Sequence, residues 1–264
     1  MTSQLTAVYL GSSAEMTELL SHHLDIKGVV CEKTRINPQQ FNVCSWLQIP
    51  YISIARRSDI HNKTLPQTDV GISYGSGIIF THNEINQFPY GIWNIHPGLL
   101  PNYRGRHPVS WAMINGDKSI GITIHKIDEQ IDRGTLLSQG TIRRRINDTQ
   151  NEIETKVLQL VDRRLLSEAI DTALSGTGTD IGTGTYHPSL SKGFPNISPA
   201  QVDSGYLFNL LRSQFTFGGV TIDGAVYRSG YYYDAAFSSF FDGAIIVTCK
   251  DGIELGLFKE KKDL

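Results

Sequence analysis

Short apolar runs alternate with helical or polar segments along the first half of the chain. The first run ends at Gly11, and a helical stretch follows at 14–24, which is how an α/β unit begins. The apolar runs with the length of buried strands are 5–10, 29–31, 49–54, 70–74 and 92–95. This alternation predicts an α/β fold with a doubly wound, mostly parallel sheet.

Helical periodicity is clearest in the middle of the chain. Thr149 and Glu152 form a capping box, and an apolar stripe runs from Ile153 to Ile170, so we expect one helix from 149 to 175. A shorter helix is expected at 109–115, where Gly116 would close it. Strands are expected at 121–126 and 141–146.

The composition changes beyond this helix. Residues 175–185 are rich in Gly and Thr, which favours a loop or linker. A short helix is expected at 206–212, and strands joined by Gly turns at 220–227, 244–249 and 253–258. We therefore expect a large core domain at 1–175, a linker at 176–204 and a small, β-rich C-terminal subdomain at 205–264.

The composition is that of a packed globule. Of the 264 residues, 40% are hydrophobic and 19% charged, and the formal net charge of −2 gives nucleic-acid binding no support. Three scattered cysteines without a CxxC pair suggest neither disulfides nor zinc, and we expect no metal. With no signal peptide and no run of about twenty apolar residues, we expect a cytoplasmic protein without membrane contact.

Candidate chemistry lies at the end of the strand predicted at 92–95. Asn94 and His96 are two residues apart and would share one face, and Pro97 would turn the chain out of the sheet. Active sites of open parallel sheets lie beyond the carboxyl ends of the strands. An amide and an imidazole suit acyl transfer, and the carboxylate of Asp132 would orient the imidazole. Alone, such an Asn-x-His pair is more often a turn cap or a hydrogen-bonded histidine.

The neighbouring motifs make this interpretation more specific. Asn94-x-His96-Pro97-x-Leu99-Leu100-Pro101 is followed in order by Tyr103-Arg104-Gly105, by Gly121-x-Thr123-x-His125, and by Asp128 and Asp132-x-Gly134. This series resembles the formyltransferase superfamily over residues 69–140. The resemblance implies that Asn94, His96 and Asp132 are catalytic and that 10-formyltetrahydrofolate is the formyl donor.

The resemblance also implies where the folate binds. The pterin pocket of the family lies beside two loops, which here are 74–79 and 128–132. The residues expected to bind folate are Tyr74, Gly75, Ser76, Gly77, Ile78, Ile79, Asp128 and Ile131. The chain departs from the common family pattern at Gly98, where a Ser is usual, and at Arg106-His107, where small residues are common.

The segment after the core separates the branches of the superfamily. Residues 207–212 and 215–219, with Asp223-Gly224, are similar to nucleotide-sugar and methionyl-tRNA formyltransferases, whereas glycinamide ribonucleotide enzymes generally lack this segment. Too few residues follow Arg212 for the C-terminal β-barrel of the methionyl-tRNA enzymes. We therefore expect the acceptor to be the amine of a nucleotide-linked amino sugar, made for bacterial surface polysaccharide.

Five residues are expected to bind this acceptor, and several alternatives stay open. Arg104 and Lys126 could pair with a diphosphate, and the others are Tyr103, Gly105 and Tyr186. The other possible activities are a methionyl-tRNA or glycinamide ribonucleotide formyltransferase, a formyltetrahydrofolate hydrolase, and a binding module without catalysis. Family habit implies a homodimer.

Overall fold

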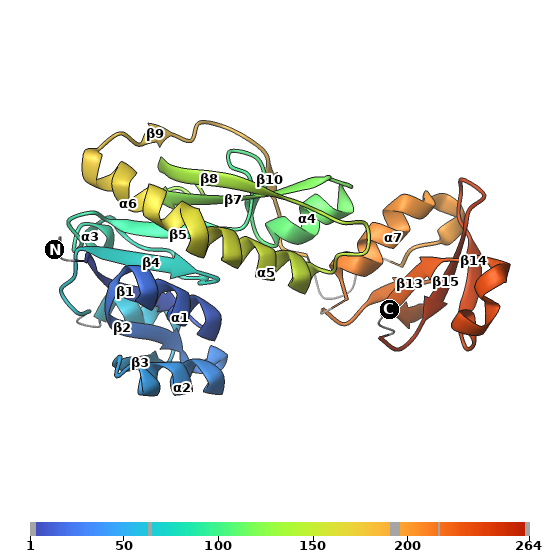
Figure 1. The fold of residues 1–264 in the computed structure, drawn as a ribbon, viewed down its shortest axis with the longest axis horizontal. Coiled ribbons are helices and arrows are strands. Elements are labelled where there is room, and N and C mark those ends of the chain that lie inside the picture. The colour runs from blue at the N-terminus through green and yellow to red at the C-terminus, as the bar shows by residue number, and fades with distance from the viewer. Residues whose placement is uncertain (1–3, 63–64, 191–195, 216, 262–264) are drawn as a thin grey trace. The chain divides into compact units, whose positions relative to one another are not determined.

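The computed structural model describes residues 4–62, 65–190, 196–215 and 217–261 (Figure 1). The chain divides into two compact units. The first comprises residues 1–101, 121–140 and 158–184, and the second comprises 102–120, 141–157 and 185–264. These boundaries differ from the division at 175 and 205 expected from the sequence, which stays a prediction.

A mostly parallel sheet organises the first unit, as predicted. In the described residues, eight strands follow the order β3-β2-β1-β4-β5-β7-β8-β9. Their bounds are β1 Thr6–Gly11, β2 Asp25–Glu32, β3 Tyr51–Ile54, β4 Val70–Tyr74, β5 Ile92–His96, β7 Ser119–Lys126, β8 Thr135–Arg143 and β9 Thr179–Asp180. Strands β1 to β5 pair in parallel, whereas β7 runs antiparallel to β5. The carboxyl end of β5 therefore lies inside the sheet rather than at its edge.

Polar capping residues mark where helices begin, and apolar residues form their buried faces. Ser13 caps α1 by accepting a hydrogen bond from the backbone N–H of Met16. Helices α1 and α2 lie side by side (Figure 1). The α-helices are α1 Ala14–His23, α2 Pro38–Trp46, α3 His82–Ile85, α4 Pro108–Ile114, α5 Gln150–Leu160, α6 Leu166–Ser175 and α7 Ser204–Ser213. Short stretches of 3-10 helix occupy Lys33–Arg35, Arg57–Asn62, Pro199–Gln201 and Ala235–Phe241.

The long helix expected from 149 to 175 is present but contains a π turn, η3, at Val161–Leu165. Its capping box is confirmed, because Thr149 and Glu152 hydrogen-bond each other's backbone N–H groups. Ile153, Val157, Val161 and Leu165 are fully buried at a spacing of four, longer than the 3.6 residues of an α-helical turn. The wider π turn keeps this stripe on one face.

Two predicted strands have different bounds in the structure. The strand expected at 141–146 is β8, and it begins six residues earlier, at Thr135. The strand expected at 220–227 is a hairpin of β11 Val220–Ile222 and β12 Ala225–Tyr227. Asp223 and Gly224 both have positive φ there, which makes the turn. Part of the expected linker is also ordered, since β9 pairs with β8.

The second unit has its own core around α7. Leu207, Leu210 and Leu211 are fully buried with Val220 and Leu255 in one cluster. Its other strands are β6 Arg104–Gly105, β10 Tyr186–His187, β13 Ser229–Tyr232, β14 Ile245–Thr248 and β15 Glu254–Phe258. The strands expected at 244–249 and 253–258 are thus confirmed as β14 and β15. Within the described ranges, every helix is too short or too polar to cross a bilayer.

Candidate active site

The first unit brings the predicted triad together at the carboxyl end of β5. His96 is the last residue of this strand, and its side chain is 5% exposed. Its Nδ1 lies 3.5 Å from Oδ1 of Asp132, whose side chain is 10% exposed. A carboxylate this close to a buried imidazole fixes the orientation of the ring. Asn94, two residues earlier, lies on the same face of β5.

A tight turn carries Asp132 to His96. Asp132 has φ of 50° and Gly134 has φ of 106°, both in the left-handed region. A Cβ on Gly134 would lie 2.1 Å from the carbonyl oxygen of Lys126, so the turn packs directly against the end of β7. Glycine at 134 is therefore a condition for the position of Asp132.

A second histidine, His125, holds the amide of Asn94. His125 lies opposite Asn94 on β7, and its Nε2 is 3.3 Å from Nδ2 of Asn94. Its Nδ1 is 3.0 Å from the backbone carbonyl of Arg133, which can only accept. Nδ1 is therefore the protonated nitrogen, and Nε2 accepts from the Asn94 amide. This chain of bonds connects the Asp132 turn to Asn94 and sets the direction of the amide.

Burial, and after it the charge of His96, lower the pKa of His125 from 6.5 to about 4. The unfolded chain therefore binds more protons at this residue between those two values, so stability is lost as the pH falls through that window. Wild type should lose about 2 kcal/mol of unfolding free energy more than a His125→Gln variant between pH 7 and pH 5. Urea unfolding at both pH values measures this. Equal losses in the two proteins would contradict a neutral, buried His125.

The other motif residues of β7 hold the loop that follows His96. Thr123 Oγ1 donates to the carbonyl of Gly98 at 2.7 Å and accepts from the backbone N–H of Leu100. Gly121 has no side chain where Leu99 packs, and a Cβ there would lie 2.3 Å from Leu99 Cβ. Gly121, Thr123 and His125 alternate along one strand, so a single face of β7 positions both the loop and Asn94.

The residues expected to bind folate lie on two loops of the first unit. The backbone from Tyr74 to Ile79 leaves the carboxyl end of β4, where the side chain of Arg35 donates to the carbonyl of Gly75 at 2.7 Å. Ser76 Oγ accepts from the backbone N–H of Ile78. In the other loop, Asp128 accepts from the backbone of Gln130. Ile79 and Ile131 are 70% and 50% exposed, which leaves apolar surface on both loops.

Four of the five residues expected to bind the acceptor lie together in the second unit. Arg104 and Gly105 form β6, which pairs in parallel with β10, placing Arg104 opposite Tyr186. Tyr103 stacks on His187 with ring centroids 5.0 Å apart, and its hydroxyl donates to Asp117. Burial raises the pKa of Tyr103. The ring of Tyr186 is exposed, so it can meet a ligand.

Lys126, the fifth of these residues, lies elsewhere. It belongs to the first unit, and its stem packs against Gly91, just before the amino end of β5. His96 is at the opposite end of that strand. The structure therefore does not bring Lys126 to the triad, and we leave it out of the acceptor site proposed below.

Sequence reasoning assigned no role to His125, Thr123 or Arg35. The alternation of Gly121, Thr123 and His125 was a usable signal, because residues two apart on a strand share a face. The hydrogen bond from Arg35 to the loop at 74–79 joins residues 40 positions apart, and no local sequence pattern predicts it.

Residues 55–170 match the model of the family described as formyl transferase. These residues belong to the formyl transferase family. The matched segment contains Asn94, His96, His125 and Asp132, so the whole cluster lies within the family domain.

Curated relatives and solved structures cover different shares of this chain. A methionyl-tRNA formyltransferase of Thermodesulfovibrio yellowstonii is 36% identical over 155 residues, 57% of this chain and 48% of that protein. The chain thus spans about half of this relative. An N-formyltransferase of Helicobacter canadensis, solved with folinic acid and dTDP-3-aminofucose, has TM-score 0.69 and 15% identity, with 97% of this chain and 100% of that chain covered. A 4-N formyltransferase of Francisella tularensis has TM-score 0.60 and 18% identity, with 98% and 99% covered.

Proposed function

We propose that this protein transfers a formyl group from 10-formyltetrahydrofolate to the amine of a nucleotide-linked amino sugar. The observation that carries the proposal is the contact of buried His96 with the largely buried carboxylate of Asp132 beside Asn94, at the carboxyl end of a central strand within a formyl transferase domain. These groups supply two hydrogen-bond donors and a carboxylate to one place. Such groups can stabilise a tetrahedral intermediate and then assist its breakdown to products.

In the proposed reaction, the neutral sugar amine attacks the formyl carbon of the folate donor. A carbon–nitrogen bond forms, and the formyl oxygen takes the negative charge. The amide of Asn94 and the protonated imidazole of His96 donate to this oxygen. Asp132 accepts the proton of the attacking nitrogen, and the proton passes to the folate nitrogen as the old carbon–nitrogen bond breaks. The products are the formamido sugar and tetrahydrofolate.

The choice of an amino sugar rests on the extent of the structural likeness and on the second unit. The fold shared with the Helicobacter and Francisella structures extends over nearly all of this chain and nearly all of each of those chains. In the second unit, Arg104 pairs with the exposed Tyr186 between β6 and β10, and its sequence neighbour Tyr103 stacks on His187. Aromatic rings and an arginine suit a base and its phosphates.

Methionyl-tRNA is the second candidate acceptor, because the curated relatives similar to this chain are methionyl-tRNA formyltransferases. The deciding experiment offers 10-formyltetrahydrofolate together with either a dTDP-linked amino sugar or charged initiator tRNA. Formylation of the sugar alone supports the proposal. Formylation of the tRNA alone would move this protein to the second candidate, and loss of formate without an acceptor would make it a hydrolase.

A Tyr186→Ala variant should raise KM for the nucleotide sugar about tenfold, the effect of losing one base–aromatic stack. Its kcat should stay near the wild-type value, because Tyr186 contributes no group to the chemical step. Steady-state kinetics with varied sugar nucleotide measure both constants. Tyr206→Ala is the matched control, since Tyr206 is also partly exposed in the second unit. Equal KM values in the two variants would remove Tyr186 from the acceptor site.

The proposal also covers the product's use, the cellular location and the oligomeric state of the enzyme. A formamido sugar linked to a nucleotide is a building block for bacterial surface polysaccharide. We propose that the enzyme acts in the cytoplasm, where its folate cosubstrate is made, and that it works as a homodimer. Sedimentation analysis of the purified protein tests the dimer.

A further inference from the structure

Three consecutive arginines stand where β8 ends, in the second unit. Arg143 is the last residue of the strand, and Arg144 and Arg145 continue the chain. Successive side chains of an extended chain point to opposite sides. Arg143 and Arg145 are accordingly exposed, whereas Arg144 is partly buried and donates to the side chain of Asn209 at 2.9 Å. Arg144 therefore anchors the backbone, and Arg143 and Arg145 project from it.

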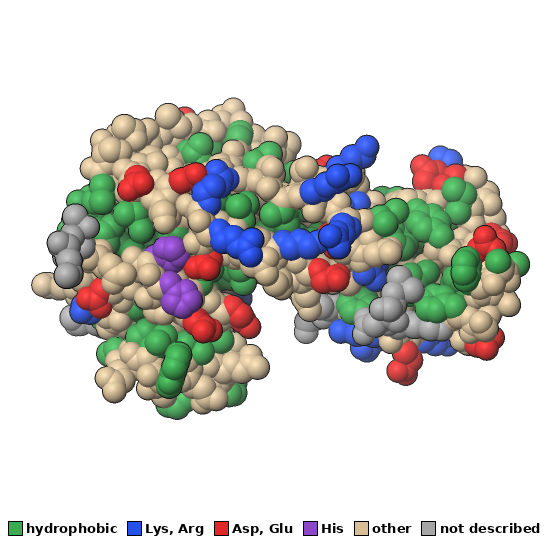
Figure 2. Space-filling model, in the orientation of Figure 1, with side chains coloured by type: hydrophobic (Ala, Val, Ile, Leu, Met, Phe, Trp, Pro, Cys, Tyr) green, Lys and Arg blue, Asp and Glu red, His purple; other side chains and the backbone are tan. Residues whose placement is uncertain are grey.

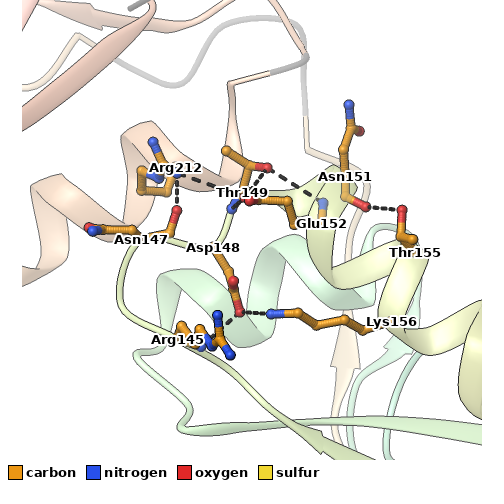
Figure 3. Close-up of polar contacts among 9 residues, drawn as sticks. All are labelled: Arg145, Asn147, Asp148, Thr149, Asn151, Glu152, Thr155, Lys156 and Arg212. Carbon is orange, nitrogen blue, oxygen red and sulfur yellow. Dashed lines mark hydrogen bonds and ion pairs between the residues drawn. The ribbon is translucent and has the colours of Figure 1, made fainter. Parts of the chain in front are cut away.

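These arginines line a hollow of about 610 Å³ together with Ile146 and Lys156. Lys156 points from α5 toward Asp148, and their charged atoms are 2.6 Å apart (Figure 3). The same carboxylate oxygen accepts from the backbone N–H of Arg145. Asp148 is buried with two donors already bound, and its charge offsets that of Lys156, so the three arginines carry the positive charge of the hollow.

The hollow has a strong positive charge for a protein of net charge −2. Four cations line it, and the described lining contains no acidic residue. Figure 2 shows Lys and Arg side chains gathered over α5. Within the described part of the chain, no carboxylate forms a salt bridge with Arg143 or Arg145. Like charges held this close favour a multivalent anion between them.

We propose that this hollow binds the diphosphate group of a small ligand. Guanidinium groups present paired N–H donors that match phosphate oxygens, and two exposed arginines can grip two neighbouring phosphates. The volume is that of a small-molecule site, whereas a nucleic-acid backbone is usually bound along an extended track. None of the four cations belongs to the proposed folate or acceptor residues, so this site goes beyond the proposed function.

Isothermal titration of the full chain with inorganic pyrophosphate tests the site. Arg143→Gln and Arg145→Gln should each weaken binding about tenfold or more, the effect of one lost charge-assisted hydrogen bond. Arg163→Gln, which changes an exposed arginine of the π turn, is the matched control and should bind like wild type. Unchanged melting temperatures would show that the variants fold.

The same titrations in an Arg104→Gln background keep a diphosphate held by the acceptor residues out of the measurement. A double R143Q/R145Q variant that binds pyrophosphate as tightly as wild type would overturn the proposal. So would a wild-type protein that binds an RNA oligonucleotide through these arginines but not pyrophosphate. Neither result would bear on formyl transfer, which is assayed separately.

Discussion

A His96→Ala variant is expected to lower kcat for formyl transfer by about a hundredfold to a thousandfold. The same loss is expected for Asn94→Ala, because each change removes one donor to the oxygen that becomes negative. The burial of His96 and its contact with Asp132 make this donor effective, since a fixed and desolvated donor needs no reorganisation during the reaction. Single-turnover rates with saturating folate and acceptor measure the chemical step itself.

Substrate binding should survive these changes, and that separates a catalytic role from a structural one. Binding of a folate analogue should weaken little in either variant. His23→Ala is the matched control, because His23 also pairs with a carboxylate, that of Asp162, but at the end of α1. It should keep wild-type turnover. Near-normal rates in both His96→Ala and Asn94→Ala would end the assignment of the triad.

Gly134→Ala is expected to destabilise the protein by about 3 kcal/mol and to lower activity together with stability. The new Cβ would meet the carbonyl oxygen of Lys126 at 2.1 Å, in a backbone of φ 106° that alanine rarely adopts. The turn must then shift, and Asp132 shifts with it away from His96. Thermal unfolding should show a melting temperature lower by about 6 °C or more.

The control for this change is Gly176→Ala. Gly176 also has positive φ, 66°, but no atom lies within 4 Å of the position of an added Cβ. It should therefore show only the cost of a left-handed alanine, about 1 kcal/mol. A Gly134→Ala protein as stable and as active as Gly176→Ala would contradict the close packing of the Asp132 turn on β7.

The positions of Asn94 and His96 could be predicted from the sequence because they depend on local signals, whereas the role of Asp132 was implied by the resemblance to the family. An apolar run ended by Pro97 places His96 at the end of a strand, and the spacing of two places Asn94 beside it. The parallel sheet follows from the alternation of such runs. These signals come from neighbouring residues, so they can be recognised in the sequence without knowledge of the tertiary structure.

Features that depend on distant residues were not predicted. The start of β8 was placed too late because Gly140 reads as an interruption of a strand. In the structure, a Cβ at 140 would lie 2.8 Å from Arg164 and 3.0 Å from Leu160, so glycine lets the helix approach the strand. The bond between His125 and Asn94 likewise requires the pairing of β5 with β7, which joins residues 31 positions apart.

The residues proposed to bind the acceptor were predictable only as separate motifs. Tyr103, Arg104 and Tyr186 meet because two strands of two residues each pair across more than 80 positions, and strands so short leave no periodic signal. The sequence therefore predicts the reaction more closely than it predicts the acceptor.

One measurement tests the central claim most directly. The protein is incubated with 10-formyltetrahydrofolate and a dTDP-linked amino sugar, and the sugar nucleotide is then examined by mass spectrometry. We expect one formyl group on the sugar amine, formed with wild type and His23→Ala and lost with His96→Ala. An unmodified sugar nucleotide in the presence of folded wild-type protein, with charged initiator tRNA formylated under the same conditions, would contradict the account.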